Sequence, residues 1–556
     1  MTNFLSNLLP AALVGAQVVL ADLPGTAGPP PDSDPLTWGF YATHEVPEAT
    51  QLEIVGTIPS WVSGSLYRGA AATWDVGNYT AEHWFDGFSR NHRFEITNGG
   101  VSYRSRNASD ELSDFVRETG LYPNGNFGSD PCKIIFGAFE TNYRDGNDKH
   151  GDKSTSNVNV AWAPNFAGVG VNTSSDVSST PFDTLVMTTD ANELHQLDPV
   201  TLEPIELFTY QASNPLLVNS GRSAAHPIVG QDGTIYNYVL DLEQEPPTYH
   251  VFRVSPPEGE TTIMASITDA PPAYIHSMFG TEKHIILIVW QADLTQQGKT
   301  VLSSIGAWNP DRKALFYVVD RENGGLVGKY ESPDTFFAFH EINSFEDEDG
   351  SIFIDLPRMD DDGFLNAAKV PSLRANLGSP NATSKQDLSG AFTRYRLPHI
   401  SECGHGKKTA AAATNSTSIP WRKAEIDFSL DYKLANLELP RINPARQGKP
   451  YRYAYGIHTE TTGYFADSII KIDTERESWT VWEPETRHLP SEPVFIGRPG
   501  AAAEDDGVLV TVAMDSVARS SSLVFLDAQT LTEIARARMP IVMGYGFHGA
   551  WGNSRQ

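Results

Sequence analysis

The sequence predicts an all-β protein, with a β-propeller as the favoured architecture and an irregular β-sandwich as the alternative. Three observations support this prediction. Short runs rich in Ile, Val, Tyr and Phe recur along most of the chain and are bounded by Asp, Gly and Pro. Amphipathic stretches long enough for stable helices are scarce. A hairpin-like unit also recurs at widely separated positions, as expected for the blades of a propeller.

Seven runs are the best strand candidates, because each combines β-branched and aromatic residues with turn-forming residues at its ends. They are 184–188, 234–240, 284–290, 314–319, 351–356, 451–455 and 508–513. The recurring unit begins at Leu194, Ile470 and Leu523. In each case a strand ends in Asp, a tight turn follows, and a second strand starts with polar residues. The period is irregular, so the repeat alone leaves the sandwich alternative open.

Composition narrows the classes of function. The 556-residue chain has a formal net charge of -28, which argues against a nucleic-acid partner because phosphate binding requires a basic face. Its two cysteines, Cys132 and Cys403, are too few for a disulfide framework or a thiolate metal cluster. Any metal ligands must therefore be histidines or carboxylates. No obligate protein partner is indicated.

We expect a single large domain over residues 43–556, preceded by a Pro/Gly-rich lead over 1–42. Polar stretches near 374–390 and 404–420 read as surface insertions. The apolar stretch 8–20 resembles the core of a signal peptide, but residues 1–7 contain no basic residue. Secretion is therefore possible but less favoured than a cytoplasmic location.

Four histidines stand in apolar or small-residue surroundings: His226, His276, His340 and His548. A lone buried histidine usually makes a structural hydrogen bond, but metal ligation is the commonest functional reason to bury a neutral imidazole. Four such residues spread over more than half of the chain suggest a metal ion held on a central axis by several structural units. Glu341, next to His340, should point the opposite way along a strand and is not expected to be a ligand.

The contexts of these histidines occur in one order with other recognisable segments. These segments begin Gly56-Thr-Ile-Pro, Gly64-Ser-Leu-Tyr, His83-Trp-Phe-Asp, Asp232-Gly-Thr-Ile, Leu437-Glu-Leu-Pro and Pro490-Ser-Glu-Pro. With them, the chain resembles the carotenoid cleavage oxygenase family from about Thr43 to Trp551. The resemblance implies a seven-bladed β-propeller with a small helical or loop dome over the iron-bearing face. It also implies one Fe(II) per chain, with His226, His276, His340 and His548 as the metal ligands and thus the catalytic residues.

The chemistry of these ligands agrees with the resemblance. Imidazole nitrogen suits Fe(II), and four neutral donors leave coordination positions free for O₂. The family orients three of its histidines with acidic residues, and the matching positions here are Asp190, Glu438 and Glu492. Most relatives have Glu where this chain has Asp190. Because aspartate is one methylene shorter, we expect either a bridging water or a shifted backbone at this position.

The resemblance implies an oxidoreductase, a dioxygenase that cleaves one conjugated carbon–carbon double bond of a carotenoid with O₂ and releases two carbonyl products, apocarotenals. No organic cofactor is expected, since no glycine-rich nucleotide fingerprint occurs in the right context. Aromatic side chains would line a substrate tunnel and place one double bond beside the metal; blade packing is their other possible role. The candidates are Trp84, Phe85, Phe279, Phe337, Phe339, Tyr545 and Phe547.

The segments around Gly64 and His83 look most similar to fungal members, including torulene-cleaving and retinal-forming enzymes. Torulene, β-carotene or an apocarotenoid is therefore the expected substrate. Stilbene-cleaving relatives carry a lysine directly before the first orienting acid, whereas this chain has Thr189. A stilbenoid substrate, a non-enzymatic propeller that binds apolar ligands, and a calcium-dependent propeller hydrolase stay open as alternatives. Because carotenoids dissolve in membranes, we expect peripheral membrane contact through an apolar patch.

Overall fold

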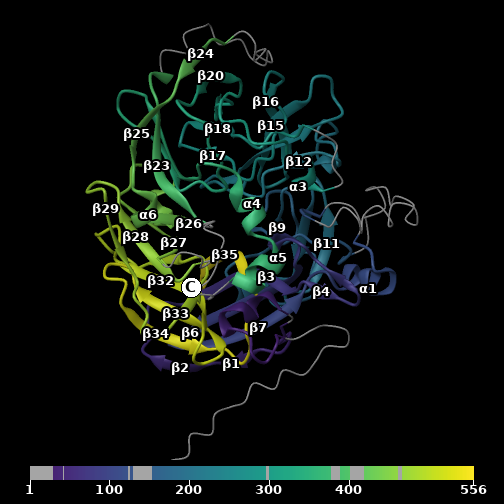
Figure 1. Ribbon diagram of the computed structural model, residues 1–556, viewed down its shortest axis with the longest axis vertical. Helices are drawn as coiled ribbons and strands as arrows, with labels where there is room; N and C mark the ends of the chain where they lie inside the picture. Colours follow the sequence, from purple (N-terminus) through teal and green to yellow (C-terminus); the bar gives the residue numbers. More distant parts are fainter. Residues whose placement is uncertain are drawn as a thin grey trace, which may run out of the picture.

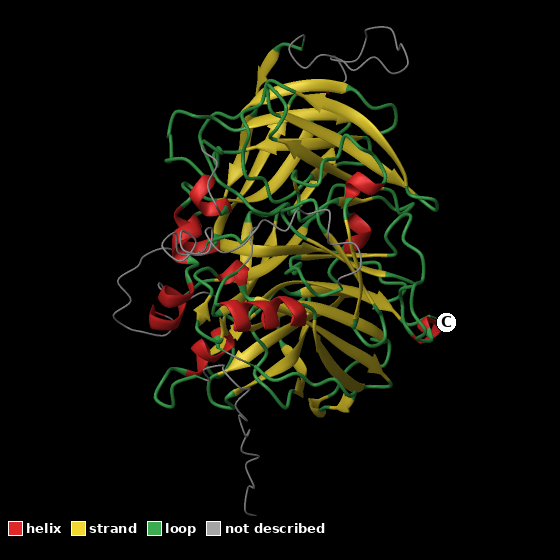
Figure 2. Ribbon diagram, turned by 90° about the vertical axis from the view of Figure 1, so that its right-hand side faces the viewer, coloured by secondary structure: helices red, strands yellow, loops and turns green. Residues whose placement is uncertain are grey.

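The computed structural model describes residues 29–41, 43–122, 126–128, 153–295, 300–376, 389–400, 419–460 and 466–555. The N-terminal apolar stretch 8–20, both cysteines and most of the two expected insertions lie outside these residues. β-Strands dominate the described part of the chain, and its helices are short (Figures 1 and 2). The sequence-based prediction of a mostly β protein is confirmed.

The described strands form six sheets of four or more strands, numbered here 1 to 6 in chain order, and one two-stranded ribbon. Sheet 1 has the order β1-β7-β6-β3-β35, that is Thr50–Gln51, Gly100–Asn107, Phe88–Thr97, Gly64–Thr73 and Gly546–Asn553. Sheet 2 has the order β11-β10-β9-β8, that is Pro204–Phe208, Leu194–Leu197, Leu185–Thr188 and Ala161–Pro164. The ribbon pairs β4, Asp75–Val76, with β5, Tyr79–Thr80.

Sheets 3 and 4 continue the series. Sheet 3 contains β12, β14, β15 and β16, with β13 also on β14: Arg222–Ser223, Ile235–Asp241, Thr248–Ser255, Glu260–Ile267 and Ile228–Val229. Sheet 4 has the order β17-β18-β19-β20-β24, that is Phe279–Gly280, His284–Val289, Leu315–Asp320, Leu326–Glu331 and Trp421–Lys423.

Sheet 5 has eight strands. They are β21, β22, β23, β26, β27, β28 and β29, with β25 also on β23: Asn343–Glu346, Ile352–Arg358, Gly390–Leu397, Asn436–Ile442, Tyr453–His458, Ser468–Asp473, Ser478–Val481 and Glu425–Ser429. Its middle is weak, because β23 and β26 pair only through Gly390 with Leu437 and Ala391 with Asn436.

Sheet 6 contains β2, β34, β33, β32 and β30, with β31 also on β32: Glu53–Gly56, Glu533–Arg538, Ser520–Asp527, Gly507–Asp515, His488–Pro490 and Val494–Gly497. Figure 1 shows the sheets following one another around the middle of the view in chain order, from β6 and β7 at the bottom through β18 and β20 at the top to β32–β34.

All seven predicted runs lie on observed strands: β9, β14, β18, β19, β22, β27 and β32. Strands β14 and β32 are buried along their whole length. Such strands carry apolar residues on both faces, because neighbouring sheets pack against each side. The buried apolar residues form one large cluster that spans several sheets, with smaller clusters between individual sheet pairs.

The recurring hairpin has a common turn chemistry. Asp198, Asp473 and Asp527 each end a strand region and accept hydrogen bonds at Oδ1 from the backbone N–H groups two and three residues later. Asp320 and Asp515 make the same pair of contacts in two further hairpins. A carboxylate that satisfies two backbone donors fixes the tight turn locally. The repeated Asp in the sequence is therefore a turn-forming residue.

The two ends of the chain exchange strands between the first and last sheets. Strand β2, near the start, pairs with β34 of sheet 6, whereas the C-terminal strand β35 pairs with β3 of sheet 1. This exchange joins sheet 6 to sheet 1 by backbone hydrogen bonds at two places. Sheets that are adjacent in space are thereby held together although they are farthest apart in sequence.

The described α-helices are α1 (Asp110–Thr119), α3 (Val301–Ser304), α4 (Gly363–Ala367), α5 (Val370–Asn376) and α6 (Tyr432–Ala435). The described 3₁₀ turns are η1 (Pro35–Phe40), η2 (Trp84–Asp86), η4 (Val177–Ser179), η5 (Tyr210–Ala212) and η8 (Pro444–Arg446). Figure 1 shows α4 and α5 in the middle of the view. They join η1 and η2, since Arg374 donates to the Phe40 carbonyl at 2.7 Å and His83 Nε2 lies 2.9 Å from the Leu365 carbonyl. These contacts bring the short helices into one group.

We expect Gly546→Ala to destabilise the fold by about 2 kcal/mol or more, because a Cβ there would lie 1.9 Å from the Gly69 carbonyl oxygen of the paired strand. Two backbones cannot separate without breaking the β3–β35 pairing. Urea unfolding of both proteins measures the change. Gly170→Ala is the control, since its nearest neighbour would be 3.8 Å away. Equal stability of Gly546→Ala and wild type would contradict the expectation.

Candidate metal centre

Four sheets each deliver one histidine to a common point. His226 precedes β13 in sheet 3, His276 precedes β17 in sheet 4, and His340 precedes β21 in sheet 5. His548 lies in β35, the strand that the C-terminal segment adds to sheet 1. Each of the four strands involved pairs near one end of its sheet. The common position in successive sheets brings together residues that are far apart in the chain.

The imidazole nitrogens are close enough to share one ion. One nitrogen from each ring lies within 4.8 Å of the others, and the His340 and His548 Nε2 atoms are 3.1 Å apart. Two nitrogens bound at right angles to one metal ion are about 3 Å apart for metal–nitrogen bonds of about 2.1 Å. The His226 Nε2 is buried and has no hydrogen-bond partner in the structure. Four converging nitrogen donors of this kind fit a single metal ion.

Carboxylates orient three of the four rings. Asp190 Oδ1 accepts from His276 Nδ1 at 2.7 Å, and Glu438 Oε2 accepts from His340 Nδ1 at 2.5 Å. Glu492 Oε1 accepts from His548 Nδ1 at 2.7 Å. A ring that donates its Nδ1–H to a carboxylate carries its lone pair on Nε2. The lone pairs of these rings are therefore directed away from the carboxylates and toward one another.

Asp190 reaches its histidine without an intermediary. The bridging water considered from the sequence is not the arrangement found, since carboxylate and imidazole are in direct contact. Tyr274, which was not predicted from the sequence, donates its hydroxyl to Asp190 Oδ2 at 3.0 Å and lies 3.2 Å from His276 Nδ1. Burial, reinforced by the charge of Asp190, raises the pKa of Tyr274 well above its ordinary value. The phenol therefore stays a hydrogen-bond donor at physiological pH.

Glu492 is held by two arginines that the sequence analysis also missed. Arg441 donates to both carboxylate oxygens, at 2.8 and 3.1 Å, and the Gly549 N–H donates at 2.8 Å. The fully buried Arg68 lies 3.7 Å from Oε2, and burial, opposed by Glu492, lowers the pKa of Arg68 to about 10. Burial alone would raise the pKa of Glu492, but Arg441, His548 and Arg68 together hold it below its ordinary value. Both arginines lie within the segments that carry the family resemblance.

Glu438 has a more local second contact. Its Oε2 also accepts the N–H of Leu439 at 2.6 Å, and Leu439 has a positive φ of 46°. Oε1 is buried without a hydrogen-bond partner in the structure. Strand β26 is irregular at this point, because its register with β27 shifts between Glu438 and Arg441. The irregularity allows both side chains of one short segment to reach the centre.

His226 is positioned by backbone contacts. Its N–H donates to the His276 carbonyl at 3.2 Å, and its own carbonyl accepts the Met278 N–H at 3.0 Å. Thr188 Oγ1 donates to the carbonyl of the preceding Ala225 at 2.5 Å. Burial lowers the pKa of His226 far below its ordinary value, and burial also lowers that of His548 to about 3. These rings are neutral at physiological pH, as metal ligation requires.

Aromatic side chains cover the histidines on one side. The Phe339 ring centroid is 5.4 Å from that of His276, and Phe85 lies 5.9 Å from Phe339 and 5.3 Å from Phe547. Phe364 of α4 completes the group at 4.7 Å from Phe339. Three predicted tunnel residues, Phe85, Phe339 and Phe547, thus meet beside the centre. Phe364 was not predicted, because nothing near it in the sequence relates it to the histidines.

Phe127 extends the same aromatic surface. Its ring lies 4.9 Å from Phe85 and 5.5 Å from Tyr274. Asp86 accepts the N–H groups of Phe127 at 2.5 Å and Gly128 at 2.8 Å, and so holds this segment beside η2. Burial raises the pKa of Asp86 to about 6 in spite of these two hydrogen bonds.

The other predicted tunnel residues pack differently. Phe279 and Phe337 lie 6.4 and 6.3 Å from Trp290, and Phe337 touches the main aromatic group through Phe339 at 4.8 Å. Both are fully buried. Their packing against Trp290 corresponds to the alternative role stated for them, that of blade packing.

Trp84 and Tyr545 join the aromatic group to the N-terminal turn η1. Trp84 lies 4.4 Å from Phe547 and donates its Nε1–H to the Tyr545 carbonyl at 3.0 Å. The Tyr545 ring lies 4.8 Å from Phe40, and its hydroxyl donates to the Leu36 carbonyl at 2.8 Å. Residues of the expected lead 1–42 therefore pack against the β-sheet body.

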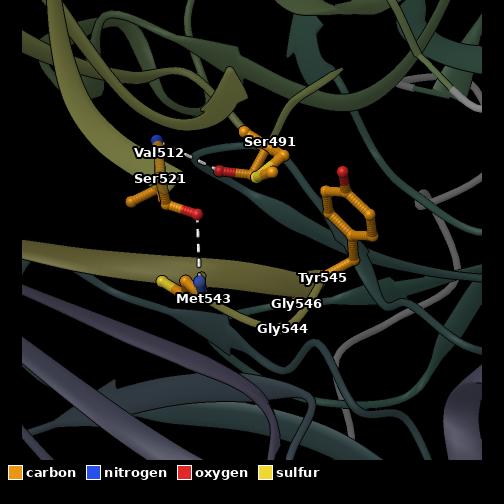
Figure 3. A pocket seen from close by; sticks show the side chains of 8 residues that line it. Ser491, Val512, Ser521, Met543, Gly544, Tyr545 and Gly546 are labelled. Carbon is orange, nitrogen blue, oxygen red and sulfur yellow. Dashed lines mark hydrogen bonds between the residues drawn. The ribbon is translucent and has the colours of Figure 1, made fainter. Parts of the chain in front are cut away.

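A small cavity is lined in part by Tyr545 and lies between strands of sheet 6 and the start of β35 (Figure 3). Ser491 accepts the Val512 N–H at 3.2 Å, and Ser521 accepts the Met543 N–H at 2.9 Å. Its water-accessible space of about 10 Å³ holds about one water molecule. This cavity is too small for a polyene and is separate from the histidines.

Comparison with known proteins agrees with the fold and the centre. Residues 39–553 match the family described as retinal pigment epithelial membrane protein. A torulene dioxygenase of Gibberella fujikuroi is 33% identical over 90% of each chain, and a carotenoid dioxygenase of Neurospora crassa is 31% identical over 90% of this chain and 88% of its own. A cobalt-substituted apocarotenoid oxygenase of Synechocystis has a TM-score of 0.68 at 22% identity, covering 93% and 99% of the two chains.

The fold and the centre define a class of sheet-built proteins in which separate sheets bring histidines to one metal site. The chain belongs to the retinal pigment epithelial membrane protein family, that is, the carotenoid oxygenase family. The resemblance stated from the sequence motifs is confirmed. Within the described residues, no helix is both long and apolar enough to cross a membrane.

We expect Arg441→Met to destabilise the protein by about 3 kcal/mol at neutral pH, because Glu492 would lose its two-point partner while remaining buried. The depressed pKa of Glu492 means that its ionised form stabilises the fold above pH 4–5 and that this contribution is lost as pH falls. The difference between variant and wild type should therefore shrink below about pH 4, where protonation neutralises the buried carboxylate.

Urea unfolding at several pH values measures this difference. Arg452→Met is a matched control, since Arg452 makes a comparable two-point contact with Asp473, a carboxylate that is 13% exposed whereas Glu492 is 1% exposed. We expect that control to cost about 1 kcal/mol or less. Equal losses for the two variants would contradict a special role for the buried Glu492 carboxylate.

Proposed function

We propose that the protein is a non-haem Fe(II) dioxygenase that cleaves a conjugated carbon–carbon double bond of a carotenoid with O₂ and gives two carbonyl products. The observation that carries this proposal is the convergence of His226, His276, His340 and His548, with their nitrogens within 4.8 Å of one another. The names of the fungal relatives, a torulene dioxygenase and a carotenoid dioxygenase, support the choice of reaction.

In this proposal the four histidines hold one ferrous ion, and Asp190, Glu438 and Glu492 orient three of them. Neutral imidazoles are suitable ligands for Fe(II). When bound, the ion supplies the capacity to bind and activate dioxygen. The carboxylates keep the Nδ1 proton of each partner ring in place, so that ring tautomer and direction are set before the ion binds.

In this proposal the aromatic side chains beside the histidines contact the substrate. Phe85, Phe339 and Phe547 form an apolar surface beside the histidines, with Phe364 and Phe127 around it. We infer that this surface binds the polyene, excludes water and places one double bond at the centre. Trp84, Phe279, Phe337 and Tyr545 support the surface from behind or line more distant parts of the substrate path.

We also infer that the sheets form a seven-bladed propeller. Dividing sheet 5 at its weak β23–β26 junction gives seven four- to six-stranded units. Each unit then contributes one residue to the centre. Sheets 1, 3, 4 and the first half of sheet 5 contribute the histidines, whereas sheets 2, 6 and the second half of sheet 5 contribute the carboxylates. One functional residue per unit is the arrangement expected around a common axis.

Torulene, β-carotene and apocarotenoids are the proposed substrates, in agreement with the fungal relatives. A stilbenoid is the second candidate within the same chemistry, but Thr189 lacks the cationic group expected for holding a phenolate. A non-enzymatic protein that binds apolar ligands is the candidate from another class. The complete set of four histidines and three oriented rings favours an enzyme, because a binding surface needs no such centre.

We further propose that the protein is cytoplasmic and contacts membranes peripherally, since its substrates dissolve in lipid. The apolar stretch 8–20 is one element that could add to this contact. Deleting residues 1–28 and measuring sedimentation with liposomes tests its part. Unchanged partition would assign membrane contact to the rest of the chain.

The decisive experiment is product analysis by mass spectrometry with purified protein, Fe(II), O₂ and separate samples of torulene, β-carotene and a stilbenoid. We expect two complementary carbonyl products from a carotenoid, with masses that identify the cleaved bond. His340→Ala should reduce the rate at least a hundredfold because it removes one ligand and leaves Glu438 unpaired. His250→Ala is the control, since His250 contacts Ser266 and Gln244 away from the centre.

Metal analysis separates the remaining outcomes. One iron per chain with cleavage only of the stilbenoid would favour the second candidate. One iron per chain without any cleavage would contradict all three tested substrates. Neither iron nor cleavage would overturn the proposal in favour of a binding protein.

A further inference from the structure

We propose that Tyr274 is a positioning residue for the metal centre, because its hydroxyl fixes the Asp190 carboxylate that orients His276. The inference deepens the proposed function and rests on it, since it assumes that the four histidines bind a metal ion. It concerns the one orienting carboxylate that is an aspartate in this chain. Glu438 and Glu492, which orient the other two rings, are each one methylene longer.

The three side chains form a closed triangle of hydrogen-bond distances. His276 Nδ1 donates to Asp190 Oδ1 at 2.7 Å, and the Tyr274 hydroxyl donates to Asp190 Oδ2 at 3.0 Å. The phenol oxygen also lies 3.2 Å from His276 Nδ1. Both oxygens of the carboxylate are therefore engaged by residues of one segment. A carboxylate held at both oxygens cannot rotate about its last bond without losing a hydrogen bond.

The backbone explains why Tyr274 can do this. Tyr274 and His276 are two residues apart in an extended segment, so their side chains project to the same side. Tyr238 donates its hydroxyl to the carbonyl of the intervening Ile275 at 2.8 Å and fixes that segment. The Tyr274 ring is itself confined by Phe127 at 5.5 Å and Phe339 at 6.4 Å.

The other two orienting carboxylates also have a second anchor, but of a different kind. Arg441 binds both oxygens of Glu492, and the Leu439 N–H donates to Glu438 Oε2. At Asp190 the second anchor is the Tyr274 hydroxyl, which donates to Oδ2. A second anchor matters because the direction of the imidazole lone pair depends on the carboxylate that holds the ring. Loss of the anchor should therefore weaken metal binding while leaving the histidine in place.

The test uses full-length protein stripped of metal and titrated with Co(II), whose visible absorption reports ligand geometry. Tyr274→Phe keeps the ring and removes only the hydroxyl. We expect about tenfold weaker Co(II) binding and an altered absorption spectrum, in line with other substitutions of residues that orient metal ligands. Tyr330→Phe is the matched control, because Tyr330 of sheet 4 is fully buried and donates its hydroxyl to the Pro398 carbonyl. It should bind Co(II) as wild type does.

A double-mutant cycle with Asp190→Asn separates positioning from packing. If Tyr274 acts through the carboxylate, Tyr274→Phe should weaken binding tenfold in wild type and less than twofold in the Asp190→Asn background. Equal losses in both backgrounds, or none in either, would overturn the inference while the proposed function stands. Wild-type protein that binds neither Co(II) nor Fe(II) would overturn the proposed function and the inference together.

Discussion

The hydrogen bond from a histidine Nδ1 to a buried carboxylate is the interaction on which the centre depends. A free imidazole can carry its proton on either nitrogen, and only one tautomer directs Nε2 to the common point. Asp190, Glu438 and Glu492 select that tautomer for three rings. Glu438 and Glu492 are buried and Asp190 is partly buried, which is costly because each carboxylate loses hydration. The centre can exist only where each charge has further partners.

Those partners connect the chemistry to the architecture. Glu492 belongs to sheet 6, its histidine to sheet 1, and Arg441 to sheet 5, so one carboxylate links three sheets. The strand exchange of β2 and β35 between sheets 1 and 6 fixes their relative position through backbone hydrogen bonds. The fold therefore holds the partners of Glu492 in place, and the ion pairs in turn stabilise the packing of the sheets. Stability and site geometry share the same contacts.

The sequence was sufficient for the general architecture and for the composition of the centre, for different reasons. Strands such as β14 and β32 are buried on both faces, so their apolar runs are visible without any partner. The apolar surroundings of the four histidines suggested a metal site, whereas the roles of Asp190, Glu438 and Glu492 were implied only by the resemblance, because nothing local marks an orienting carboxylate. Tyr274 and Arg441 were not predicted, since their partners lie 84 and 51 residues away and a hydrogen bond at that separation leaves no pattern in one sequence. Asp190 contacts its histidine directly because the two segments of the backbone approach closely. The length of the aspartate side chain alone could not indicate this.

The three oriented histidines are not equivalent, although their ligand atoms are. Glu492 shares its charge with Arg441, Arg68 and the Gly549 N–H, which leaves less of it for His548. Glu438 accepts from both His340 Nδ1 and the Leu439 N–H at Oε2, whereas its Oε1 has no hydrogen-bond partner in the structure. His226 is held by backbone contacts. The four rings therefore differ in the contacts that hold them. Sheets of similar construction thus produce an asymmetric site, because the carboxylates that orient the histidines have different partners.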